Sequence, residues 1–109
     1  MAESTITWKG KSGTEYKYWI NEIGNKKKDE PGNYIFIKET SKGRFKPIYI
    51  GDTDSLDDRL SNPESHHKRP CTKREGATHV CTHTNSRGQK ARQNEEKDLI
   101  GAYDPPCND

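Results

Sequence analysis

The stretch "KPIYIGDTDSLDDRL", residues 46–60, predicts a short strand that leads directly into a helix. The run "PIYIG" (47–51) is apolar and rich in residues that favour strands. Gly51 at its end predicts a tight turn, into which a side chain would intrude. Tyr49 in the strand and Arg59 in the helix stand ten positions apart. The stretch therefore predicts a strand–turn–helix corner, and it raises the question whether Tyr49 and Arg59 serve one chemical site.

The helix of this corner has its own start signal. Asp54 or Ser55 can accept a hydrogen bond from a free backbone N–H group of the first turn, where the helix dipole also favours acidic residues. Leu56 and Leu60 are one turn apart and predict the inward face. Arg59 lies about 60° from Leu56 around the helix axis, so it is expected on the flank of the apolar stripe.

A second apolar run, "YIFIK" (34–38), predicts a strand that pairs with residues 47–51 in antiparallel fashion. Side chains alternate between the two faces of a strand, so Tyr34 and Tyr49 are expected to share one face. The opposite face is expected to carry the four isoleucines of the two runs: Ile35, Ile37, Ile48 and Ile50.

The remaining strands are predicted at the two sides of this pair. Residues 1–31 contain two strand-like pieces with Gly10 and Gly13 between them, which predicts an extra hairpin on the sheet. The alternating segment "ATHVCTH" (77–83) predicts a third core strand.

One further helix is predicted near the end of the chain. Residues 86–103 form a long helical segment with Ser86 as a candidate cap, and two prolines end it. Residues 62–76 contain prolines and a glycine and are expected to be irregular. The predicted fold class is α+β, with a small, mainly antiparallel sheet of three core strands plus the hairpin, flanked by helices.

Composition limits the classes of protein that remain. The chain has 109 residues, of which 27% are hydrophobic and 33% charged, and its formal net charge is +2. This length predicts one domain, and the clustered apolar runs predict a small core with a very polar exterior. No segment is long and apolar enough to predict a membrane span or an export signal, so we expect a cytoplasmic protein. The three cysteines are accordingly expected to be free thiols.

The last predicted helix carries a carboxylate on its inward face. Its apolar stripe consists of Leu99, Ile100 and Tyr103, and Glu96 projects near the middle of that stripe. Glu95 projects toward solvent. An inward carboxylate costs several kcal/mol unless it is paired or holds a metal. Glu96 is therefore either half of a buried ion pair, with Arg92 or Arg59, or a functional group.

These residues together resemble a known family. "GNYIF" (32–36) followed by "IYIG" (48–51) resembles the paired signature of the GIY-YIG nuclease domain. The resemblance covers about residues 32–109, which we expect to form the nuclease domain, with residues 1–31 as an N-terminal extension. The ordered set that matches the spacing of the family consists of Tyr34, Tyr49, Arg59, Glu96 and Asn108.

Three positions depart from the pattern of the family. Asn33 replaces the usual apolar residue of the first signature. Where family members often have a histidine or tyrosine one turn after the arginine, this chain has Pro63, and His66 or His67 is the displaced candidate. Asp52 stands where some members have a lysine, and it would place an acid near a phosphate.

The resemblance implies hydrolysis of a phosphodiester bond in DNA. Glu96 would hold Mg²⁺ or Mn²⁺ in a one-metal mechanism, and a single carboxylate with several waters suits magnesium. Arg59 would contact the scissile phosphate, for which its permanent charge and planar fork are suited. One of the two tyrosines would accept the proton of the attacking water, with Tyr34 favoured as the base and Tyr49 for positioning.

The resemblance implies further roles around this centre. His66 or His67 would relay the proton or bind phosphate, and Asn108 would order the site through hydrogen bonds. The small net charge favours weak or nonspecific DNA binding, or a partner protein that brings DNA to the domain. An alternative function is a catalytically weak or inactive DNA-binding module of the same fold.

A zinc site is a second reading of the cysteines and histidines. His79, Cys81 and His83 would share one strand face, with Cys71 as a further ligand. This set lacks the usual paired spacing of zinc ligands, so a core-facing cysteine with histidines at the sheet edge is the alternative.

Overall fold

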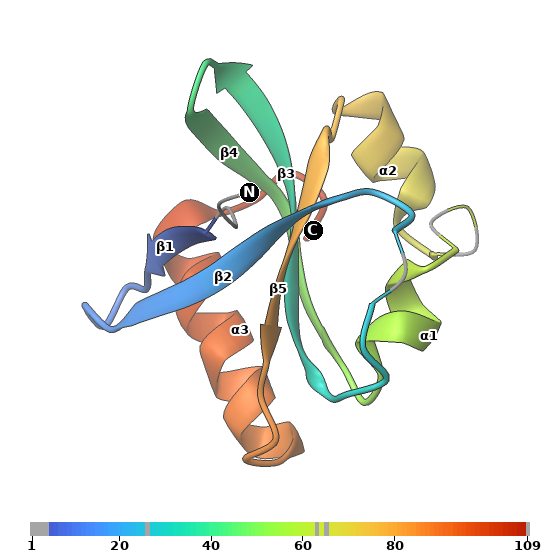
Figure 1. The fold of residues 1–109 in the computed structure, drawn as a ribbon. Helices are drawn as coiled ribbons and strands as arrows, with labels where there is room; N and C mark the ends of the chain where they lie inside the picture. Colours follow the sequence, from blue (N-terminus) through green and yellow to red (C-terminus); the bar gives the residue numbers. More distant parts are fainter. Residues whose placement is uncertain (1–4, 26, 63, 65, 109) are drawn as a thin grey trace.

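A single antiparallel sheet organises the chain (Figure 1). The computed structural model describes residues 5–25, 27–62, 64 and 66–108, and within these ranges the sheet has five strands in the order β1-β2-β5-β3-β4. The elements in chain order are β1 (Thr5–Lys9), β2 (Glu15–Glu22), β3 (Gly32–Ser41), β4 (Arg44–Thr53), α1 (Leu56–Leu60), α2 (Arg69–Arg74), β5 (His79–Thr84) and α3 (Gln89–Tyr103). The predicted α+β class with a mainly antiparallel sheet is confirmed.

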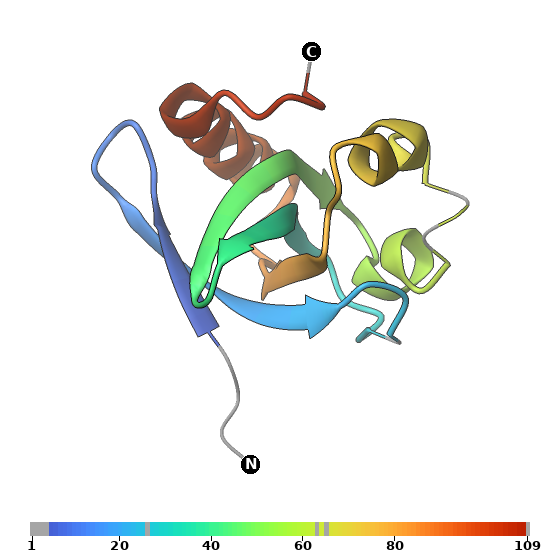
Figure 2. The same cartoon turned by 90° about the horizontal axis from the view of Figure 1, so that it is seen from above.

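The curled sheet lies between two layers of helix. Figure 2 shows α3 on one side, with α1 and α2 together on the other. Buried side chains on the α3 side form a cluster of Trp8, Tyr18, Ile35, Ile37, Ile50, Cys81 and Leu99. Those on the α1 and α2 side are Tyr34, Phe36, Ile48, Tyr49, Leu56, Leu60, Val80 and Cys107. The face that carries the two tyrosines is therefore part of the core.

The expected alternation fails at one residue. Ile48 packs with the tyrosines, not with the other three isoleucines. The pairing of β3 with β4 shifts here, because Phe36 lies opposite Tyr49 while Ile37 lies opposite Pro47. This bulge adds one residue to β4 and turns Ile48 to the other face.

Gly51 does not form the predicted turn. It lies within β4 opposite Tyr34, and the strand continues to Thr53. The reason for glycine here is instead the close approach of other side chains, described below. The helix that follows does begin as expected, since the Ser55 side chain accepts a hydrogen bond from the backbone N–H of Asp58, 3.2 Å away.

Two expectations about helices are wrong. Part of the segment 62–76 is helical, since α2 covers Arg69–Arg74 with Pro70 in its first turn, where a missing N–H group costs nothing. Pro63 lies outside the described residues. Ser86 is not the cap of α3, because the helix begins at Gln89 after Gly88, and no side chain among the described residues caps it.

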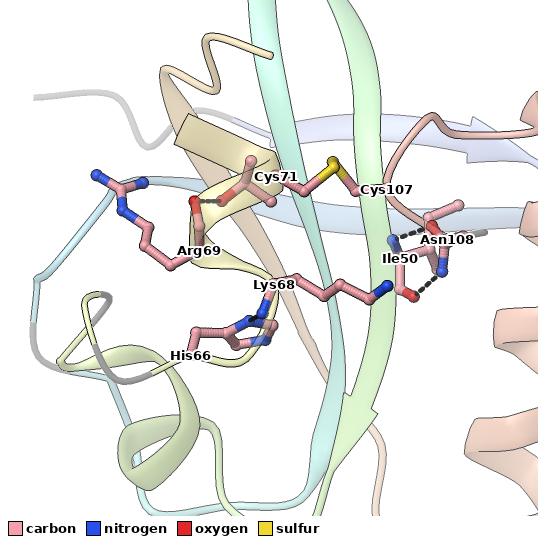
Figure 3. Close-up of a disulfide and its surroundings, with 8 residues drawn as sticks. Ile50, His66, Lys68, Arg69, Cys71, Cys107 and Asn108 are labelled. Atoms are coloured by element: carbon pink, nitrogen blue, oxygen red, sulfur yellow. Dashed lines mark hydrogen bonds between the residues drawn. A yellow bond between two sulfur atoms is a disulfide. The ribbon is translucent and has the colours of Figure 1, made fainter. Parts of the chain in front are cut away.

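The prediction of three free thiols is wrong for two of them. Cys71 on α2 and Cys107 after α3 form a disulfide (Figure 3). The Cys107 N–H donates to the Ile48 carbonyl over 3.0 Å. Cys81 is buried and has no cysteine partner in the described part of the chain. Because disulfides persist in oxidising surroundings, this bond does not favour the predicted cytoplasmic location, which remains a prediction. In the described ranges, each helix is too short or too polar to cross a membrane.

Candidate active site

Four elements bring the sequence-predicted residues to one region of the sheet. Tyr34 comes from β3, Tyr49 from the edge strand β4, Arg59 from α1 and Glu96 from α3. The side chains are close enough that the charges of Arg59 and Glu96 act on the ionisation of both tyrosines. Residues that span more than sixty positions of sequence therefore share one electrostatic environment.

The two tyrosine rings lie side by side, with centroids 6.1 Å apart. Tyr34 is fully buried and Tyr49 is 9% exposed. A Cβ atom at Gly51 would lie 2.7 Å from the Tyr34 hydroxyl and 3.0 Å from the Tyr49 ring. Any other residue at this position would push the rings apart, which explains why the strand has glycine here.

His66 donates a hydrogen bond to Tyr34. The Tyr34 oxygen lies 2.7 Å from His66 Nε2, and His66 Nδ1 accepts from the backbone N–H of Lys68 at 3.0 Å. Burial lowers the pKa of His66 to about 4, and neighbouring cationic groups add to this effect, so the ring is neutral. A neutral imidazole that accepts at Nδ1 carries its proton on Nε2. His66 therefore donates to the Tyr34 oxygen.

Arg59 completes the surroundings of Tyr34. Burial and the nearby Tyr49 raise the pKa of Tyr34 well above its ordinary value, while the charge and hydrogen bond of Arg59 oppose this rise. Burial and then Glu96 raise the pKa of Tyr49, and the Tyr34 hydroxyl opposes this rise. Tyr34 thus lies between His66, from which its oxygen accepts a hydrogen bond, and the ring of Tyr49.

Two neighbours of His66 also reach Tyr49. His67 stacks on His66 at 4.7 Å between centroids and meets the Tyr49 ring edge-on at 6.0 Å. The Lys68 ammonium lies 6.0 Å from the centre of the Tyr49 ring. Sequence reasoning missed Lys68, because a lysine in a loop next to a proline-containing segment has no local feature that indicates a site.

A second acid accompanies Glu96. The carboxyl group of Asp52, on β4, lies within hydrogen-bonding reach of Glu96. Burial, and then Asp52, raise the pKa of Glu96 to about 7. Glu96 is half-buried, and its close partner is this acid, not Arg92 or Arg59 as the ion-pair reading predicts.

The fully buried carboxylate of α3 is that of Glu95, not that of Glu96. Glu95 is 1% exposed, which contradicts the prediction that it faces solvent. It accepts hydrogen bonds from the Tyr18 hydroxyl (2.5 Å) and from the Asn85 amide (3.3 Å), and it contacts His83 Nδ1 at 3.0 Å. The helical projection fails because two of the three stripe residues are not in the core: Ile100 is only partly buried and Tyr103 is exposed.

The same polar network explains the departure at Asn33. Asn33 is fully buried, its amide donates to the Arg92 carbonyl at 2.9 Å, and it accepts from Asn85 at 3.3 Å. An apolar residue would make neither bond. Asn33 and Glu95 thereby tie α3 to the sheet, which holds the adjacent Glu96 at the site.

Asn108 lies behind β4. Its side-chain oxygen accepts from the Ile50 N–H and its amide donates to the Ile50 carbonyl, both at 2.8 Å (Figure 3). It pairs with the edge of β4 between Tyr49 and Gly51, as a neighbouring strand would do. Asn108 therefore holds the strand and does not reach toward the other site residues through these bonds.

The alternative zinc set is not assembled. Cys71 is bonded to Cys107, and burial raises the pKa of Cys81 to about 12, which disfavours the thiolate that zinc requires. Among the described residues, no group of three or more histidine, cysteine, aspartate or glutamate side chains is arranged to hold a metal ion.

Comparison with known proteins identifies the class of protein. Two solved structures of the GIY-YIG N-terminal endonuclease domain of UvrC from Thermotoga maritima are similar to this chain, each with a TM-score of 0.58. They are 31% and 30% identical in sequence, and the similarity covers 75% of this chain and 86% of theirs. The chain belongs to the GIY-YIG nuclease family.

Both related structures are tyrosine-to-phenylalanine point mutants bound to the catalytic divalent cation. A scan of protein-family models finds no match to this chain, and no curated protein matches it. The residues present suit such a cation, because Glu96 is a partly desolvated carboxylate next to a second carboxylate. Carboxylate oxygens are the ligands that hard divalent cations prefer.

Proposed function

We propose that this protein is a metal-dependent DNA endonuclease that hydrolyses phosphodiester bonds. The observation that carries this proposal is the convergence of Tyr34, Tyr49, Arg59 and Glu96, from four elements, at one edge of the sheet. The similarity to endonuclease domains supports the same reaction class. Residues 32–109 would form the nuclease domain, with residues 1–31 as an extension that adds β1 and β2 to its sheet.

Glu96 would hold Mg²⁺ or Mn²⁺. When bound, the ion supplies charge stabilisation at a non-bridging phosphate oxygen and at the leaving 3′ oxygen. Arg59 would bind the scissile phosphate, where its charge opposes the negative charge that develops in the transition state. Lys68, next to Tyr49, would add positive charge on the phosphate side, where Asp52 takes the place of the lysine that some family members have.

The difference in burial favours Tyr49 over Tyr34 as the base. Tyr34 is fully buried and its oxygen is engaged by His66, whereas 9% of Tyr49 is exposed, so Tyr49 is the one that can meet a water molecule. In the phenolate form Tyr49 would take a proton from the water whose oxygen attacks phosphorus, while the bond from phosphorus to the 3′ oxygen breaks. Tyr34 and His66 would stabilise that phenolate, and His67 would face the same substrate edge. Asn108 would keep β4 in place.

A plasmid assay tests this function. Supercoiled plasmid is incubated with the protein and Mg²⁺ or Mn²⁺, and nicked circles are measured over time between about pH 6 and 10. We expect metal-dependent nicking that falls by about 100-fold or more in Glu96→Ala and in Arg59→Ala, because each removes a charge that acts on the transition state.

Two matched variants serve as controls. Asp58→Asn and Arg74→Ala remove a charge of each sign from exposed positions on α1 and α2, and both are expected to nick at the wild-type rate. If the wild type binds DNA but does not nick it under any of these conditions, the chain is a DNA-binding module. The contact between Asp52 and Glu96 is the feature that favours that alternative, since it places a second acid beside the phosphate.

A partner protein that brings DNA to the domain is part of the proposal. The net charge of +2 gives little general attraction for DNA, because few phosphates can be neutralised. A cytoplasmic location stays a prediction from the sequence.

A further inference from the structure

The side chain of Asp52, the acid on β4 that departs from the family pattern, points toward α3. Ile50 packs into the cluster that contains Leu99 of α3, and Asp52, two residues further along the same strand, points to the same face. Asp52 is therefore directed at α3, where its carboxylate lies 4.0 Å from Nε of Arg92, one helical turn before Glu96, and its carboxyl group lies within hydrogen-bonding reach of that of Glu96. Tyr49 and Gly51 alternate to the opposite face of β4.

Two carboxylates in contact need a positive charge or a shared proton between them, since like charges at this distance repel strongly. The charge of Lys97 acts on Glu96, and the cationic side chain nearest Asp52 in the described contacts is Arg92, which is 5% exposed. Its terminal nitrogen is bonded to Asp54 at 2.6 Å, and its Nε lies 4.0 Å from Asp52 without any hydrogen-bond partner among the described residues. The Arg92 guanidinium therefore lies near Asp52 and Asp54. It has no described contact with Glu96, so it does not neutralise the Asp52–Glu96 pair by lying between the two carboxylates.

We propose that Asp52 is a second carboxylate ligand of the divalent cation, together with Glu96. This inference rests on the proposed function, because it assigns one more ligand to the same ion. One or two carboxylates with several waters form the usual protein share of a magnesium site.

As a metal ligand, Asp52 would favour activity, whereas the sequence alone suggests that it opposes activity. An acid beside a phosphate would repel the substrate, whereas an acid that shares the cation raises the affinity for that cation. The two roles predict opposite effects of removing the charge. Loss of a metal ligand weakens metal binding, whereas loss of an acid that only shares a proton with Glu96 frees that carboxylate and strengthens metal binding.

Calorimetric titration with Mn²⁺ alone, without DNA, tests this proposal. The full chain is compared as wild type, Asp52→Asn, Asp52→Glu, Glu96→Gln and Asp58→Asn. We expect Asp52→Asn to weaken Mn²⁺ binding by about tenfold or more, as loss of a ligand or its close support does. Asp52→Glu should keep most of the affinity, and Asp58→Asn, which removes the same charge from an exposed site on α1, should bind as the wild type does. The melting temperature of each metal-free variant shows that it is folded.

The remaining outcomes separate this proposal from the proposed function. If Asp52→Asn binds Mn²⁺ as tightly as the wild type or more tightly while Glu96→Gln does not bind it, Asp52 is not a ligand and the one-carboxylate site stands. If the wild type does not bind Mn²⁺, or Glu96→Gln binds it normally, both the shared ligand and the role of Glu96 in the proposed function are wrong.

Discussion

His66 shows at the scale of one residue how burial defines a chemical role. The ring is 4% exposed and lies against Tyr34, Phe36 and Tyr49, with its two nitrogens engaged by the Lys68 N–H and the Tyr34 oxygen. A protonated ring would lose the acceptor at Nδ1 and place a charge among aromatic rings. The neutral form is therefore part of the folded structure, and His66 acts as a donor to Tyr34, not as an acid at neutral pH.

This predicts a pH-dependent contribution to stability. The pKa of His66 is lowered from 6.5 to about 4 in the folded protein, so its contribution is fully present above pH 6.5 and is lost as the pH falls toward 4. We expect a loss of about 2–3 kcal/mol of unfolding free energy from this residue over that range. Urea unfolding of the wild type and of His66→Gln between pH 7 and pH 4 measures it. The difference between the two proteins should shrink toward pH 4, and a constant difference would contradict the prediction; His67→Gln, the stacked neighbour, is the control.

At the scale of elements, the placement of α3 depends on polar contacts in the interior. The inward side of the helix carries Arg92, Glu95 and Leu99, of which only the last is apolar. Glu95 is held by β2, by β5 and by the residue after β5, while Asn33 of β3 bonds to the backbone of α3. The direction of Glu96 toward the site follows from this attachment.

Restoring the family-like apolar residue at position 33 is therefore expected to be harmful. Asn33→Ile should lower the free energy of unfolding by about 1–3 kcal/mol, because it leaves buried polar groups of the network without a partner. It should also weaken nicking, since α3 carries Glu96. Urea unfolding and the plasmid assay measure both effects. A variant at least as stable as the wild type would show that the network does not hold the helix, and Asn94→Ile, at an exposed position on α3, is the control.

At the scale of the whole molecule, one covalent bond joins the two segments that flank the site. The disulfide links α2, which directly follows His66 and His67, to the C-terminal segment that carries Asn108 (Figure 3). That segment pairs with β4 at Ile48 and Ile50, on either side of Tyr49. The bond therefore fixes the histidine segment and β4 relative to each other.

Reduction of this bond is expected to destabilise the protein. A cross-link between residues 36 positions apart contributes about 3–4 kcal/mol in the chain-entropy account. Dithiothreitol should lower the unfolding free energy of the wild type by this amount and should slow nicking. The double variant Cys71→Ser, Cys107→Ser is the control, because the reductant has no bond to break there. Equal sensitivity of both proteins to the reductant would assign the effect to something other than the disulfide.

The local features of the chain were predictable because neighbouring residues carry them. The strands around Tyr34 and Tyr49, the Ser55 cap and the ordered set from Tyr34 to Asn108 all depend on alternation, capping chemistry or spacing along the sequence. The family and its fold class followed from that set. Contacts between the elements were harder to predict from the sequence, because they depend on how the faces of helices and strands pack and not on neighbouring residues.

The sequence by itself determined the class of fold, the family, and the residues that gather at one edge of the sheet. Only the tertiary structure decided which way several of them face: a bulge turned Ile48 to the other side, and a buried network placed Glu95 inside and Glu96 at the site. It also joined Cys71 to Cys107 and brought Asp52 against Glu96. The physical reason is that each of these outcomes is a contact between different elements or a shift of register, and helical or strand periodicity carries no information about either.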